Sequence, residues 1–363
     1  AALGGGTVRV LEGEYLMYDS VRLKSGVSLT GDGVGRTVLK KVACSKSYLK
    51  ATSGYGENQI IIFDPRGFEV GYGVAVFDDK AEGFLCTVGT IIEQTAEDTF
   101  KLNTAMNADC MIENNAMAVT IYPVITASNC CDVTIKDISI DGNRQENLYL
   151  NGCRGGGVFL INTNNVLIQN CCVINYNGDG ISYQNCNDVI VLDSISKRNT
   201  GFGFHPGSGS MRTIVRNCIA TENDSIGFFF CWRVKGGVVE NCEFSDNKGA
   251  GISIGHRDTD NVILNNRILN NKNGGIEFRD EDVIHAPHRT RIEENEILDN
   301  GVEPEFFGIK VLGEASDILI KGNKIGTGSP EGNSMGIYIA NSTSNITIAD
   351  NLFLNTKQKI VKL

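Results

Sequence analysis

Residues 251–274 read GISIGHRDTDNVILNNRILNNKNG, and this stretch holds one copy of the pattern that decides the fold. A glycine opens a segment in which apolar and polar residues alternate, short apolar segments follow, and asparagines stand at the bends. Alternation with period two is typical of β-strands, and asparagine and glycine are typical of turns. The stretch therefore predicts short strands joined by tight turns, without a segment of helical periodicity.

The same pattern recurs along the chain in three columns that keep one phase. Its opening glycine recurs at nearly even intervals, with longer steps only before the last two copies, at Gly157, Gly180, Gly203, Gly227, Gly251, Gly275, Gly308 and Gly336. A second column of small or amide side chains runs through Cys171, Ser194, Cys218, Cys242, Asn266, Asn295, Asn323 and Asn351. The third column keeps a constant step and consists of Asn199, Asn223, Asn247 and Asn271.

Short strands that repeat without crossover helices stack on their equivalents in the next repeat, about 4.8 Å away, and form a solenoid. We therefore expect an all-β protein, a right-handed parallel β-helix with coils of about 24 residues and stacked asparagines at its turns. It is expected to form a single domain over residues 1–363. The period is lost at about 45–125, which we interpret as a β-rich excursion, and regular coils are expected from about 126 to 363.

Composition limits the partners of the chain. Its 363 residues carry 33 basic and 43 acidic side chains, a net charge of −10. A chain this acidic is a poor candidate for binding nucleic acid, and it has no apolar run of transmembrane length, so we expect neither a nucleic-acid nor a membrane partner. The oligomeric state stays open. The start, AALGGGTVRV, is compatible with a secreted or periplasmic protein whose leader is absent from this chain.

The twelve cysteines are interpreted as packing residues rather than as a disulfide framework. Cys171, Cys218 and Cys242 occupy the column position that later coils give to asparagine. We therefore expect most of the cysteines to be reduced and buried.

A candidate site follows from the distribution of rare residues. All four histidines and the only tryptophan lie between positions 205 and 288, on successive coils, whereas a structural residue type would be spread along a solenoid. We expect a cleft there, the alternative being surface residues that cluster by chance. The candidate catalytic residues are His205, His256, Glu277 and Asp280. The candidate substrate-binding residues are Trp232, Arg233, Arg257, Arg279, Lys310 and His288.

Residues 201–210, GFGFHPGSGS, interrupt the alternation of the other coils. Pro206 falls on an inward position and Gly207 has no side chain, so the coil is expected to present His205 over an open floor for a ring-shaped ligand. The alternative is a bend with a surface histidine. Longer loops at DEDVIHAPH and VEPEFF are expected to wall the face, and His256 is expected to approach Asp280 on the next coil.

The opening GGTVRVLEGEY and the asparagine columns resemble the pectate-lyase-like superfamily, right-handed parallel β-helices that are mostly polysaccharide lyases, uronan epimerases and glycoside hydrolases. Locally, GFHP at 203–206 is similar to the GFDPH active-site segment of mannuronan C5-epimerases. This chain lacks their catalytic residues: His205 stands in place of Asp, Gly207 in place of the catalytic His, and Phe202 in place of the catalytic Tyr. The resemblance therefore implies a place for sugar chemistry but not the epimerase reaction.

Three functions are compatible with these residues. The first is a lyase acting on a uronate-containing polysaccharide or oligosaccharide, in which His205 or His256 is the base and the cations stabilise the carboxylate. The second is a glycoside hydrolase that uses Glu277 and Asp280 as its two carboxyl groups. The third is a non-catalytic glycan-binding solenoid. No cofactor is expected, and no metal ligand is assigned, because Asp258 and Asp260 in GHRDTDN are interpreted as turn residues.

Overall fold

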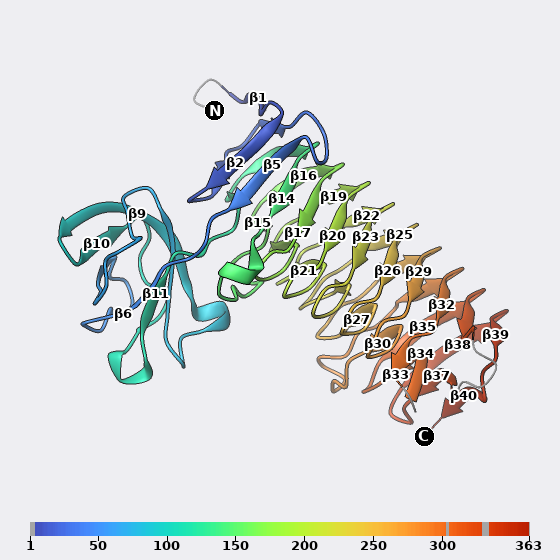
Figure 1. The fold of residues 1–363 in the computed structure, drawn as a ribbon. Helices are drawn as coiled ribbons and strands as arrows, with labels where there is room; N and C mark the ends of the chain where they lie inside the picture. The colour runs from blue at the N-terminus through green and yellow to red at the C-terminus, as the bar shows by residue number, and fades with distance from the viewer. Residues whose placement is uncertain (1–3, 303–304, 329–333, 363) are drawn as a thin grey trace.

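A computed structural model describes residues 4–302, 305–328 and 334–362. Three long parallel sheets, A, B and C, wind side by side along most of the chain (Figure 1). Sheet A contains β1 (Gly6–Arg9), β4 (Val27–Thr30), β13 (Cys131–Lys136), β16 (Asn164–Gln169), β19 (Val189–Leu192), β22 (Ile214–Arg216), β25 (Val238–Glu240), β28 (Val262–Leu264), β31 (Arg291–Glu293), β35 (Ser316–Lys321) and β38 (Ser344–Ala349).

The other two sheets follow the same order along the solenoid. Sheet B contains β2 (Gly13–Met17), β5 (Thr37–Lys41), β14 (Ser139–Asp141), β17 (Cys172–Ile174), β20 (Ile195–Lys197), β23 (Ile219–Thr221), β26 (Glu243–Ser245), β29 (Arg267–Leu269), β32 (Glu296–Leu298), β36 (Lys324–Gly326) and β39 (Leu352–Leu354). Sheet C contains β3 (Val21–Leu23), β12 (Ile125–Ser128), β15 (Val158–Ile161), β18 (Ile181–Gln184), β21 (Phe204–Gly207), β24 (Phe228–Phe229), β27 (Ile252–Ile254), β30 (Ile276–Phe278), β34 (Glu305–Val311), β37 (Ser334–Ile339) and β40 (Gln358–Lys362). The short strand β33 (Gly301–Val302) lies off this order and pairs antiparallel with β34.

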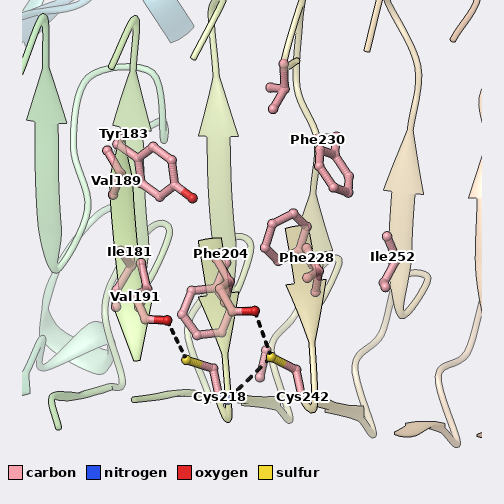
Figure 2. Packing of buried hydrophobic residues seen from close by; sticks show 14 of the residues in the cluster. Ile181, Tyr183, Val189, Val191, Phe204, Cys218, Phe228, Phe230, Cys242 and Ile252 are labelled. Atoms are coloured by element: carbon pink, nitrogen blue, oxygen red, sulfur yellow. Dashed lines mark hydrogen bonds between the residues drawn. The ribbon is translucent and has the colours of Figure 1, made fainter. Parts of the chain in front are cut away.

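The register of sheet C confirms the predicted fold class. Ile181 pairs in parallel with Phe204, Phe204 with Phe228, and Phe228 with Ile252, and all four side chains are fully buried. Each is the first residue after a repeat glycine, so the sequence period corresponds to one coil. Figure 2 shows these side chains stacked along the interior, where the one continuous core of the solenoid forms.

The turns are held by the predicted asparagine columns. The Asn223 side-chain amide donates to Asn247 Oδ1 over 2.9 Å, and Asn247 donates to Asn271 Oδ1 over 2.9 Å. In the second column, the Cys218 backbone N–H donates to the Cys242 sulfur, and the Cys242 N–H donates to Asn266 Oδ1. All twelve cysteines are unpaired, and eight of them are buried.

A second body of β-structure branches from the first coils (Figure 1). It is a six-stranded antiparallel sheet of β6 (Lys46–Tyr48), β11 (Met117–Val119), β8 (Gly73–Phe77), β9 (Thr87–Ala96), β10 (Thr99–Leu102) and β7 (Gln59–Ile61). Its core is a separate hydrophobic cluster that includes Phe68 and Phe100. Three short 3₁₀ helices occur in the described residues: η1 (Gly83–Leu85), η2 (Ile112–Asn114) and η3 (Arg144–Glu146).

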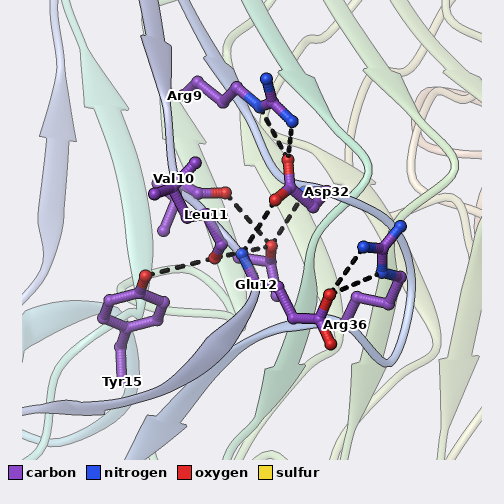
Figure 3. A network of polar contacts seen from close by, with 8 residues as sticks. Arg9, Val10, Leu11, Glu12, Tyr15, Asp32 and Arg36 are labelled. Atoms are coloured by element: carbon purple, nitrogen blue, oxygen red, sulfur yellow. Dashed lines mark hydrogen bonds and ion pairs between the residues drawn. The ribbon is translucent and has the colours of Figure 1, made fainter.

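Charged side chains tie the first coil to the second (Figure 3). Arg9 donates to Asp32 over 2.7 Å, and Arg36 donates to Glu12 over 2.6 Å. The second oxygen of Asp32 accepts the Glu12 backbone N–H. Arg9 and the Arg36–Glu12 pair are more than half exposed, so each contact adds at most about 1 kcal/mol. Among the described residues, no helix has the length and apolar character needed to cross a membrane.

Candidate functional site

A cleft of about 570 Å³ lies on the outer face of sheet C, over coils β15 to β24. Sheet strands supply its floor, and chain segments that leave the solenoid supply its walls. The residues that line it are Phe84, Tyr149, Asn151, Gly152, Cys153, Arg154, Ile161, Gln184, Asn185, Phe202, His205, Ser208, Phe229, Cys231, Trp232 and Arg233.

One wall is the covering loop, residues 142–157, which runs from β14 to β15. The coil that leads from Ile125 to its partner Val158 is longer than the coil that leads from Val158 to its partner Ile181, and the covering loop accounts for the difference. The loop is docked on the next coil and on the excursion: Ser182 Oγ donates to the Gly152 carbonyl over 2.6 Å, and Arg154 Nε donates to the Phe84 carbonyl over 2.6 Å.

His205 lies beneath this loop rather than over an open floor. Its ring Nδ1 is 2.6 Å from Asp179 Oδ2, and the two side chains are 3% and 0% exposed. The other oxygen of Asp179 accepts the Phe202 backbone N–H over 2.8 Å. Gly152 covers the pair so closely that a Cβ there would stand 2.7 Å from His205 Nδ1. The expectation of an open His205 is wrong because the covering loop fills the space above it.

The predicted gap at Gly207 is also filled. A Cβ on Gly207 would lie 2.5 Å from Gln184 Oε1 and 3.0 Å from the Cys231 Cβ, so these two side chains occupy the space. The Gln184 amide nitrogen donates to Ser182 Oγ over 3.0 Å and stands 3.4 Å from His205 Nε2. Gly207 therefore serves to admit Gln184 rather than a ligand.

Two cysteines meet His205 at the floor of the cleft. One ring nitrogen of His205 and the sulfurs of Cys153 and Cys231 all lie within 4.8 Å of one another. The neighbouring Cys231 thiol lowers the pKa of Cys153, as do His205 and Arg154, whereas burial and the Asp179 charge oppose this. Cys153, together with burial, raises the pKa of Cys231. Of the two thiols, Cys153 is therefore the one that loses its proton more readily.

A stack of three rings borders the cleft at Trp232. The Trp232 and His256 ring centroids are 4.4 Å apart, those of His256 and His285 are 4.6 Å apart, and both pairs are nearly parallel. His256 Nδ1 is 3.7 Å from Glu281. Burial lowers the pKa of His256, and the Glu281 charge partly opposes this. The expected neighbour, Asp280, is exposed, so the carboxylate beside His256 is the next residue along the loop.

Arg279 is occupied by the solenoid itself. Its guanidinium donates to the Cys231 carbonyl over 2.7 Å and to Ser253 Oγ over 3.0 Å, and it stacks 4.6 Å from the Phe229 ring. Buried Asp258 accepts the N–H groups of nearby turns and contacts Arg279, which agrees with its interpretation as a turn residue. The prediction of Arg279 as a substrate ligand is therefore wrong in this structure, because its donors are used internally.

The other six candidates are divided between the cleft and the surface beyond it. Trp232 and Arg233 line the cleft, and Trp232 is 49% exposed. The remaining four lie outside the cleft lining and contact their own loops or neighbouring coils. Arg257 donates to the Ile284 carbonyl, Lys310 covers the Phe307 ring, His288 contacts Ser316, and Glu277 stands in register between Ser253 and Lys310.

The loop DEDVIHAPH carries His285 to the ring stack, whereas VEPEFF includes residues 303–304, which lie outside the described residues. The sequence analysis missed Asp179, Cys153, Arg154, Tyr149 and Phe84. One signal could have found the three that belong to the covering loop: the long interval between the end of the excursion and Gly157 marks an insertion before the regular coils.

Three parallel sheets around one core, with stacked asparagines at the turns, define a parallel β-helix. A family model described as the right handed beta helix region matches residues 89–233 and 208–353. The chain belongs to this family. Comparison with curated protein sequences finds no significant match.

Solved structures with the same fold include several proteins of different function. The A-module of mannuronan C-5 epimerase AlgE4 from Azotobacter vinelandii is 19% identical, with a TM-score of 0.54 over 96% of this chain and 69% of that one. PfbA, a surface adhesin of Streptococcus pneumoniae, is 15% identical, with a TM-score of 0.57 over 99% and 86% of the two chains. A glycoside hydrolase is 10% identical, with a TM-score of 0.54 over 97% and 89%. At these identities the likeness shows the fold.

Proposed function

We propose that the protein is a lyase that cleaves a uronate-containing glycan by β-elimination in the cleft. The observation that carries the proposal is the character of the lining, which has five aromatic residues besides histidine and two arginines. Aromatic rings pack against the apolar faces of sugar rings, and arginine binds carboxylates through two parallel hydrogen bonds. The mannuronan epimerase and the glycoside hydrolase among the structures of similar fold support a glycan as the ligand class.

The lining disfavours hydrolysis. Glycoside hydrolysis needs two carboxyl groups on either side of the scissile bond. None of the described residues that line the cleft is acidic, and neither Glu277 nor Asp280 is among them. Elimination instead needs a base and a cation beside the substrate carboxylate. Arg154 and Arg233 line the cleft, and His256 lies at its border, stacked on Trp232.

The base in this proposal is His256. It borders the cleft through its stack on Trp232, its side chain is 20% exposed, and its lowered pKa keeps it neutral at physiological pH. His205 is less suited, because its side chain is 3% exposed beneath the covering loop. In the reaction, the His256 ring takes the C5 proton, and the electron pair left at C5 is delocalised onto the substrate carboxylate. The C4–C5 double bond then forms as the C4–O bond breaks, and the leaving oxygen takes up a proton from water.

The developing charge falls on the substrate carboxylate, where a cation stabilises it most. Arg154 and Arg233 line the cleft and supply that charge. We expect them to hold the carboxylate while the sugar lies along the edge of the Trp232–His256 stack, where C5 can approach the rim of the His256 ring.

A screen of charged and neutral glycans tests the proposal, with unsaturated uronate read by ultraviolet absorbance and reducing ends read separately. We expect both signals to rise together on a uronate glycan. His256→Ala should lower turnover roughly a hundredfold, the usual scale for a lost base. Lys235→Ala, an exposed residue on the same column of turns, should leave turnover unchanged.

The alternatives give different readouts. Reducing ends without absorbance would mean a hydrolase. Saturable binding without either signal would mean a glycan-binding solenoid. Both results would overturn the elimination proposal, as would full activity of folded His256→Ala.

A further inference from the structure

We propose that Cys153, His205 and Cys231 bind one zinc ion at the floor of the cleft, with its fourth coordination position open toward the cleft. The three candidate ligand atoms already lie within 4.8 Å of one another, although they come from the covering loop, β21 and the residues after β24. Ligand atoms around tetrahedral zinc stand about 3.5–3.8 Å apart, given metal–ligand distances of about 2.0–2.3 Å. A contraction of about 1 Å therefore completes the site.

The ring of His205 is already oriented for a metal. Its Nδ1 faces Asp179 at 2.6 Å, and Asp179 is itself fixed by the Phe202 N–H. A carboxylate on one ring nitrogen fixes the tautomer and leaves the other nitrogen free to ligate, which is the usual arrangement behind zinc-bound histidines. His205 Nε2 is thus the ligand atom in this proposal, on the side of the ring away from Asp179. It now contacts the Gln184 amide nitrogen over 3.4 Å, and the ion would replace this long contact.

A second observation points to a ligand at the same place. Gln184 is 2% exposed and reaches the cluster between Gly207 and Cys231, yet its Oε1 has no hydrogen-bond partner among the described residues. A buried amide oxygen without a partner destabilises the folded state. A water or hydroxide on the fourth position of the metal would donate to it.

The charges also balance. Two thiolates and a neutral imidazole neutralise Zn²⁺, so the ion adds no net charge to a buried site. Thiolates are the softest ligands that a protein offers, and those of Cys153 and Cys231 with one imidazole favour zinc over magnesium or calcium.

Because all three residues line the cleft, the open position faces the substrate region. An ion there would act as a Lewis acid on a substrate carboxylate. This use of the ion rests on the proposed function, whereas the metal site itself does not.

Cobalt titration of the reduced, metal-free full chain tests the site directly. We expect one equivalent of Co²⁺ to bind, with a thiolate-to-cobalt charge-transfer band in the near ultraviolet and the visible bands of four-coordinate cobalt. Zinc should displace it. Cys153→Ser and Cys231→Ser should each halve the charge-transfer band, and Asp179→Asn should weaken binding about 10- to 100-fold.

Cys131→Ser is the matched control, since Cys131 is exposed and lies outside the cleft lining, and its cobalt spectrum should equal that of the parent. Absence of the charge-transfer band in the reduced parent, or an unchanged band in the folded Cys153→Ser/Cys231→Ser variant, would overturn the metal site. A disulfide between the two cysteines that forms instead of metal binding under reducing conditions would also overturn it. Glycan cleavage without cobalt binding would leave the proposed function standing, and cobalt binding without any cleavage would leave the metal site standing.

Discussion

At the scale of single residues, Asn247 shows how one side chain serves three coils. Its amide donates to the Ala220 carbonyl and to Asn271 Oδ1, and its oxygen accepts the Asn223 backbone N–H. All of these groups are buried, and each buried polar group without a partner costs about 1–3 kcal/mol. Asn247→Ala should therefore lower the free energy of unfolding by roughly 2–5 kcal/mol, measured by urea denaturation.

Lys272→Ala tests whether any substitution near this turn has the same effect. Lys272 is exposed, and its variant should stay within about 0.5 kcal/mol of the parent. Equal stability of the two variants would mean that the asparagine columns do not hold the turns.

The pH dependence of turnover is set around His256. The charged groups that act on it are Glu281, which raises its pKa, and His285 and Arg257, which lower it, while burial lowers it most. The neutral ring is the base, so activity is lost as pH falls through the pKa of His256. Glu281→Gln removes the effect that raises this pKa, so the acid limb of kcat/KM should move to lower pH. A shift to higher pH would contradict the assignment of His256.

The sequence located part of this site and missed the rest for a physical reason. Trp232 and His256 were found because rare residues that recur at the coil period must share one face of a solenoid. Cys153 was not found, because it reaches His205 only through the docking of a loop whose path has no period. The burial of His205 was missed for the same reason.

At the scale of elements, the repeat predicted the strands of sheet C well, since a glycine followed by an apolar residue marks the same point of each coil. The covering loop has no such pattern. Its position depends on close contacts with the coils below, above all at Gly152, where a Cβ would stand 1.6 Å from Asp179 Oδ2.

Gly152→Ala tests the loop as an element. Asp179 is buried and bonded to His205 and the Phe202 N–H, so it cannot move aside cheaply. We expect the loop to lift from the floor, with loss of cobalt binding and of glycan turnover, while the coils stay folded by circular dichroism. Gly54→Ala is the control, because its nearest atom would be 3.6 Å away. Unchanged cobalt binding and turnover in Gly152→Ala would show that the loop tolerates the contact.

At the scale of the whole molecule, the described residues form two large hydrophobic cores. The solenoid core runs through the coils, and the excursion has its own cluster around Phe100, with a third small cluster that includes Cys86 and Leu150 where the excursion meets the covering loop. The excursion also contributes Phe84 to the cleft. The solenoid was predictable because its contacts repeat at one period. The contacts of the antiparallel excursion follow no period that could be detected in the sequence.

Separate cores predict separate unfolding. Phe100 is fully buried and packs against Phe68, so Phe100→Ala should cost about 3–5 kcal/mol within the excursion. Scanning calorimetry should then show a smaller transition at lower temperature while the main transition of the coils stays in place. Phe228→Ala, an equally buried residue of the solenoid, should lower the main transition instead. Glycan turnover should fall in Phe100→Ala at temperatures between its two transitions, because the wall that carries Phe84 is lost while the floor persists. A single transition that shifts alike in both variants would show instead that the two cores unfold as one cooperative unit.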